Sequence, residues 1–222
     1  MKKIRVLAII SLITFSTMGI KAQVKISVGA DFVSAYIWRG QDCGPAAFQP
    51  EISISYAGFS LSAWGSTSLQ GTNKEFDLLL NYEIAGFSIG ITDYFFPVGN
   101  YFDYKTHQFE ANLSYTVSEK LPLSFAWNTM FAGNDKDTDN KARFSSYAEI
   151  AYSLSLKYLT LDFAVGVTPW GGIYADDTSI TQIAITGSKA IEITEKYAIP
   201  IFAQVTLNPD KKDVNLIFGI SF

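Results

Sequence analysis

The chain has 222 residues, of which 48% are hydrophobic and 15% aromatic, and its formal charge is −4. This acidic balance argues against nucleic acid or an anionic headgroup as the partner, because both need a basic surface. The single cysteine, Cys43, excludes an internal disulfide framework.

The first 22 residues have the three zones of a secretory signal peptide. Lys2, Lys3 and Arg5 form a positive start, residues 6–20 are mostly apolar, and Ala22 offers a small residue for cleavage. Cleavage there leaves 200 residues with 13 basic and 21 acidic side chains, a formal charge of −8. We therefore expect a signal peptide over 1–22 and a single domain over 23–222.

The rest of the chain alternates apolar and polar residues with a period of two. In 106–117, for example, Phe109, Leu113 and Tyr115 share one face while Glu110 and Asn112 share the other. Such segments predict twelve strands, with 10–14 possible, at 24–38, 47–56, 59–66, 75–84, 87–95, 106–117, 122–131, 143–152, 158–167, 179–191, 197–207 and 213–222. Most have the ~9–11 residues that a tilted strand needs to cross a bilayer.

The links between these strands alternate in length. Short turns are expected at 57–58, 85–86, 118–121, 153–157 and 192–196, and longer polar links at 39–46, 67–74, 96–105, 132–142 and 168–178. Short periplasmic turns and long extracellular loops are typical of outer-membrane barrels. The tenth strand is the least regular, because Gly187 and Lys189 disturb its phase, and we expect a bulge there.

Aromatic residues gather at both ends of the predicted strands. One end carries Tyr56, Phe59, Tyr82, Phe87, Tyr115, Tyr152, Tyr158, Tyr197 and Phe222, and the other carries Tyr36, Trp38, Phe76, Phe95, Phe131 and Phe144. Two such rings mark the two membrane interfaces. Only helices and closed barrels satisfy all backbone groups in lipid. The sequence thus predicts an all-β, single antiparallel transmembrane barrel in the outer membrane of a Gram-negative bacterium, surrounded by lipids and lipopolysaccharide.

Residues 31–50 resemble the opening of a family of bacterial porins often called TorF-type. The shared motif reads here as Ser34, Tyr36, Trp38, Arg39 and Gly40, followed by the step Pro45-Ala46. The resemblance implies an outer-membrane barrel with a transport role, and it supplies no catalytic residues. The terminal Phe222 also resembles the signal through which barrel-assembly machinery recognises its clients, which would make that machinery a partner during biogenesis.

The inward-facing phase of the strands is acidic. Its carboxylates are Asp31, Glu51, Asp77, Glu83, Glu110, Glu149 and Asp162. A barrel lined with acids attracts cations, so we expect a narrow, cation-leaning diffusion pore for small solutes. Arg39 falls on the same phase, where it could clamp the first long loop to a carboxylate or select solutes. A plugged, non-conducting structural or surface-interaction barrel is the alternative, because twelve strands lie between filled and open barrels.

Two weaker sites complete the sequence analysis. A membrane-embedded lipid hydrolase would need a nucleophile beside a base, but the only histidine, His107, has Phe109 where a serine partner would be wanted. The chain is therefore not expected to be an enzyme. Asp135, Asp137 and Asp139 resemble the start of a calcium loop that lacks its glycine and closing glutamate. We expect a solvated acidic loop there, no bound metal and no cofactor.

Overall fold

In the computed structural model, residues 23–97, 99–195 and 197–222 are described, and the predicted signal peptide lies outside them. The strands are β1 (Lys25–Trp38), β2 (Gln41–Tyr56), β3 (Phe59–Ser68), β4 (Lys74–Ile84), β5 (Phe87–Phe95), β6 (His107–Thr116), β7 (Leu123–Gly133), β8 (Ser146–Ser155), β9 (Thr160–Thr168), β10 (Ser179–Thr194), β11 (Tyr197–Asn208) and β12 (Asp213–Ser221). One short 3₁₀ helix, η1 (Tyr104–Thr106), precedes β6. Among the described residues, no helix is long and apolar enough to span a membrane.

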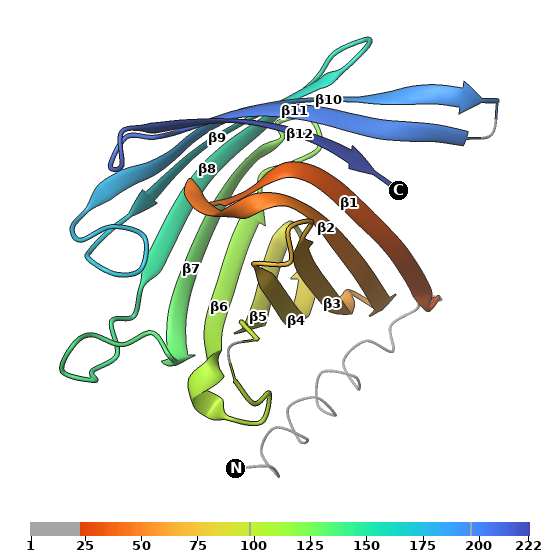
Figure 1. Ribbon diagram of the computed structural model, residues 1–222. Helices are drawn as coiled ribbons and strands as arrows, with labels where there is room; N and C mark the ends of the chain where they lie inside the picture. The colour runs from red at the N-terminus through yellow and green to blue at the C-terminus, as the bar shows by residue number, and fades with distance from the viewer. Residues whose placement is uncertain (1–22, 98, 196) are drawn as a thin grey trace.

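The twelve strands close into one antiparallel barrel in which every strand pairs with its neighbours in sequence, and β12 pairs with β1 (Figure 1). The predicted fold class is confirmed. We call the end with the turns at 57–58 and 85–86 the turn end, and the opposite end, with the connections at 96–106 and 134–145, the loop end.

The outer face of the barrel is apolar. Ile26, Val28, Leu61 and Ile89 are among many large side chains that stay exposed on it. The aromatic ring at the turn end is borne out by exposed outer side chains that include Tyr56, Phe87, Tyr152, Tyr158, Tyr197 and Phe222. An exposed apolar surface this extensive needs an apolar environment around it.

The first connection differs from the prediction. A long link was expected over 39–46, but Trp38 pairs with Gln41, and the turn consists of Arg39 and Gly40 alone. Both residues have positive φ, 52° and 76°. Two successive positive φ angles are those of a type I′ turn, whose twist suits a tight hairpin. The residues of the expected loop instead extend β2, so β1 and β2 form one long hairpin.

The tip of this hairpin, residues 34–46, leaves the barrel wall. On one side, β1 pairs with β12 at only three positions, from Asp31 to Val33. On the other side, β2 pairs with β3 no further than Ala47, and Pro45 has no N–H to extend that ladder. A register shift after Tyr36 leaves an extra residue in β2, and such bulges bend a hairpin. The hairpin tip can therefore turn away from the wall (Figure 1).

The irregularity expected in β10 lies elsewhere. Gly187 and Lys189 keep a regular register with β11, and the shifts fall after Ile180 and after Glu192. Gly187 and Lys189 interrupt the series of apolar outward residues on β10, but they add no extra residue to the strand. Beyond Ser188, β10 pairs with β11 only, and the two strands project past the rest of the turn end (Figure 1).

Candidate functional site: the hairpin tip inside the lumen

The hairpin tip reaches across the inside of the barrel to the opposite wall. Arg39, at its turn, contacts Glu110 of β6 with both guanidinium NH groups, at 2.5 Å and 2.9 Å from the two carboxylate oxygens. A two-point contact of this kind fixes orientation as well as distance. β1 and β6 are not neighbours in the wall, so the ion pair spans the lumen.

Other side chains complete a cluster around this pair. Tyr94 of β5 donates to Glu110 at 2.9 Å, and Asn112 donates to the same carboxylate oxygen at 2.7 Å. Tyr174, from the loop between β9 and β10, lies within 3.3 Å of the other oxygen and also accepts from Arg39. We call Arg39, Glu110, Tyr94, Asn112 and Tyr174 the Arg39 cluster.

The Arg39 cluster is buried and charge-paired. The Glu110 side chain is 0% exposed and the Arg39 side chain 12%. The guanidinium carbon lies 4.4 Å from the ring centre of Trp38 and 4.8 Å from that of Tyr147, which adds cation–π attraction. Burial raises the pKa of Tyr174 above its ordinary value, so its hydroxyl stays protonated and can donate to Glu110.

Further contacts hold the hairpin tip on the β10–β12 side. The Gly40 carbonyl accepts from Asn208 at 2.9 Å, and Gln41 donates to the Tyr174 carbonyl at 3.2 Å. A Cβ at Gly40 would lie 1.8 Å from the Thr181 carbonyl oxygen, so only glycine fits this approach. Below the tip, Val33 and Ala47 pack with Ile217 of β12 in a small apolar core. The hairpin tip and its contacts thus cross the loop-end half of the lumen.

The turn-end half of the lumen is open. A cavity of about 440 Å³ lies there, lined by small polar side chains and by two charged ones, among them Lys25, Ser27, Ser53, Ser55, Ser62 and Glu83. Glu51 and Glu83, both predicted to line the pore, are exposed on this half. Water can therefore enter from the turn end as far as the hairpin tip.

The other predicted pore residues are distributed along the wall. Glu149 accepts from Tyr147 at 2.7 Å and from Gln182 at 3.2 Å, so it belongs to the polar filling. Asp31 lies at the β1–β12 seam opposite Ser221, and Asp162 lies half-buried on β9. Asp77 is 5% exposed, and one of its oxygens has no hydrogen-bond partner among the described residues. The structure brings only Arg39 and Glu110 of the predicted set into direct contact.

The loop-end aromatic ring differs from the prediction. Tyr36 and Trp38 lie inside the barrel, where their rings pack against Trp64 and Tyr94, because the hairpin tip has left the wall. Of the others, Phe76, Phe131 and Phe144 remain exposed, and Phe95 is buried beneath Tyr101.

The described residues of the connection between β5 and β6 fold over the outside of the barrel, where Tyr101 packs against Phe76, Phe95 and His107. His107 is buried at the rim between Asp93, at 2.7 Å, and the Tyr101 carbonyl, at 2.5 Å. Both ring nitrogens of the histidine therefore have partners, and neither faces a serine. His107 therefore anchors the connection between β5 and β6 to the barrel wall.

The acidic loop that resembles a calcium site is a folded turn. Asp135 is buried and binds the Ser145 amide and hydroxyl, at 2.8 Å and 2.6 Å. Asp137 accepts from the amides of residues 139 and 141, and Asp139 pairs with Lys141 at the surface. The three carboxylates hold different partners, and within the described residues no group of three acidic, histidine or cysteine side chains could hold a metal.

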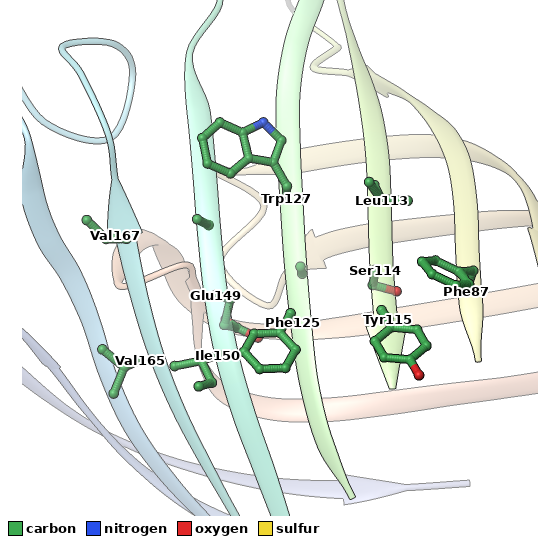
Figure 2. A pocket seen from close by; sticks show the side chains of 12 residues that line it. Phe87, Leu113, Ser114, Tyr115, Phe125, Trp127, Glu149, Ile150, Val165 and Val167 are labelled. Carbon is green, nitrogen blue, oxygen red and sulfur yellow. The ribbon is translucent and has the colours of Figure 1, made fainter. Parts of the chain in front are cut away.

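An apolar groove of about 470 Å³ lies on the outer face of β6–β9. Phe125, Trp127 and Ile150 line it together with Val165 (Figure 2). These are outward-facing residues of their strands, so the groove belongs to the apolar exterior and is separate from the lumen.

Sequence reasoning missed three members of the Arg39 cluster. Asn112 was placed on the same face of 106–117 as Glu110 but was given no role in a site. Tyr94 alternates with the outward Asp93 and Phe95, and its inward phase was readable from the pattern of β5. Tyr174 lies in a loop, where no periodicity indicates a direction. Only the three-dimensional path of the loop places it beside Glu110.

No family model and no curated protein matches the sequence, so the resemblance to TorF-type porins stays a prediction. Among solved structures, the barrel is similar to an outer-membrane channel from Pseudomonas putida F1, with 12% identity and a TM-score of 0.42 over 92% of this chain and 95% of that one. It is also similar to BamA from Haemophilus ducreyi lacking POTRA domains 1–3, with 10% identity and a TM-score of 0.41 over 89% of this chain. The chain spans about half the length of that BamA structure, 48%.

Proposed function

We propose that this protein is an outer-membrane channel of a Gram-negative bacterium whose lumen is closed by its own first hairpin. The apolar outer face and its aromatic ring support a position in the membrane. The observation that carries the closure is the contact of Arg39, on the hairpin tip, with Glu110 on the far wall. Transport follows when the Arg39 cluster opens.

The hairpin tip is suited to move as a unit. Its ends are bound to the wall, since Ser34 accepts from the Phe218 amide at 2.9 Å and the Ala46 carbonyl accepts from the Leu69 amide at 2.8 Å. Between them, residues 35–45 pair with neither β3 nor β12, so their release breaks no wall hydrogen-bond ladder. Residues 35–45 are held by contacts that each involve a side chain. Their partners are Glu110, Tyr174, Asn208, Asn73 and Lys211. Release leaves the barrel closed by its other pairings and frees the loop-end half of the lumen for small solutes.

The open channel should prefer cations. Glu51 and Glu83 face the turn-end half, and Glu149 and Asp162 stand on the inward face further round the wall. Opening the Arg39 cluster also removes the guanidinium from Glu110, which adds one more uncompensated carboxylate to the lumen. A low-dielectric wall focuses the field of such groups on passing ions.

Solute uptake by proteoliposomes tests this proposal. Arg39→Ala should make liposomes swell in small neutral sugars and in salts of small cations, whereas the wild-type protein should swell slowly. Arg143→Ala is the matched control, because Arg143 is exposed in a loop and its loss should leave the slow rate unchanged.

The second candidate is a plugged structural barrel, favoured by the fully buried Glu110 and by Tyr147, which is 1% exposed within the lumen. Folded Arg39→Ala protein that swells no faster than wild type would support this candidate and would exclude the channel.

A further inference from the structure

A second cavity, of about 540 Å³, lies at the loop end between the hairpin tip and the β3–β5 wall. Its lining includes Tyr36 and Cys43 from the hairpin and Ser66 and Glu75 from the wall. We call it the upper cavity. A space of this size fits a small organic molecule, since ligand pockets range over about 300–1,000 Å³.

Two carboxylates of β4 lie at and below the floor of the upper cavity. Glu75 lines the cavity together with Lys74, and Asp77 lies beneath its lining. Glu75 pairs with Ser66 across β3 and β4, and Asp77 lies two residues deeper on the same inward face, opposite Trp64. Asp77 is 5% exposed, and its Oδ1 atom has no hydrogen-bond partner among the described residues. A buried carboxylate oxygen without a hydrogen bond is costly, and a cation that reaches it reduces that cost.

Aromatic rings stand beside these carboxylates. The rings of Tyr36 and Trp64 have centres 5.7 Å apart and are inclined by 57°, so they form an angled wall between the hairpin tip and β3. The faces of such rings attract organic cations within about 6 Å of their centres. Lys74 lies exposed at the cavity and makes no ion pair with either carboxylate among the described residues.

We infer that the upper cavity binds a small organic cation, an amine whose ammonium group lies at Glu75 and Asp77 and whose apolar part lies against Tyr36 and Trp64. This inference deepens the proposed function by naming a class of solute. The binding that it predicts does not depend on conduction, because the cavity is present while the hairpin tip is docked.

Calorimetric titration of the purified, detergent-solubilised protein with phenethylamine tests the inference. We expect saturable binding of the amine and none of 2-phenylethanol, which has the same shape without the charge. Asp77→Asn and Glu75→Gln should each weaken the affinity about tenfold or more, since each removes a charge-assisted contact. Glu119→Gln is the control, because Glu119 is exposed in the turn between β6 and β7 and its variant should bind like wild type.

Three outcomes would overturn the inference. They are an absence of amine binding by folded wild-type protein, equal binding of the alcohol, and an affinity unchanged in both carboxylate variants. Heat-modifiable mobility in electrophoresis verifies the fold of each variant, and the half-buried Glu75 supplies the decisive comparison if Asp77→Asn fails to fold. Amine binding in a protein whose Arg39→Ala variant shows no swelling would retain this site and reject the channel, so the two proposals fail separately.

Discussion

The ion pair between Arg39 and Glu110 combines opposing energetic effects. Burial of two charges costs more than their attraction returns unless further hydrogen bonds satisfy them. Here Tyr94, Asn112 and Tyr174 supply those bonds to Glu110. The pair is therefore sensitive to the loss of one member, which leaves the other charge buried and unpaired.

A double-mutant cycle measures this dependence at the residue scale. Arg39→Met and Glu110→Gln should each lower the free energy of unfolding by about 3 kcal/mol, the cost of breaking a buried pair. The double variant should lose clearly less than the sum of the two, because no isolated charge remains. Urea unfolding in phospholipid vesicles provides the measurement, and strictly additive losses would show that the two side chains act independently.

Among the elements, the first hairpin depends on a glycine at its turn. Gly40 and Gly71 have nearly the same backbone conformation, φ 76° and 72°, but only Gly40 has a neighbour where a Cβ would lie. Backbone strain from alanine is therefore similar at the two sites, and the clash with Thr181 is specific to Gly40.

Gly40→Ala should push the hairpin tip off β10 and expose the peptide bond after Arg39. Limited trypsin digestion should then release a fragment ending at Arg39 at least about tenfold faster than in wild type, since cleavage follows the population of the open form. Gly71→Ala should be cut at the wild-type rate. Equal rates in the two variants would mean that the contact with Thr181 does not hold the hairpin.

The same hairpin shows how far sequence reasoning reaches. All twelve strands and the turns Ala57-Gly58 and Ala85-Gly86 follow from local alternation and turn chemistry. Arg39-Gly40 has the same pattern, a residue followed by glycine, but a longer polar link was expected over 39–46. The path of the hairpin into the lumen depends on where its pairing with the neighbouring strands stops, at Val33 and Ala47. A local alternation of residues does not predict the register between strands that are distant in sequence.

The candidate site was predictable in part for the same reason. The alternation of apolar and polar residues placed Arg39 and Glu110 on the inward-facing side of their strands. Because a guanidinium group matches the geometry of a carboxylate, an arginine there was expected to pair with one. Which carboxylate it meets depends on how far the hairpin tip leans across the barrel. The burial of His107 under the connection at 96–106 likewise depends on that loop folding outward, and no periodic signal gives a loop its direction.

On the scale of the whole molecule, the barrel is divided into two halves. The turn-end half holds an open polar cavity, and the loop-end half is crossed by the hairpin tip and the Arg39 cluster, with the upper cavity beside the tip. Twelve strands enclose too much space for wall side chains alone to fill and too little for a wide channel. In this barrel the hairpin tip occupies part of the space that the wall side chains leave. Its withdrawal would open the closed lumen.

Single-channel recording in a planar bilayer under a salt gradient tests this account most directly. The wild-type protein should stay closed or open only briefly, while Arg39→Ala should give long-lived discrete steps with a cation-selective reversal potential. Arg143→Ala should behave as wild type. Steps of equal size and duration in the wild-type and Arg39→Ala proteins, or no steps from either folded protein, would contradict the closure of the channel by its first hairpin.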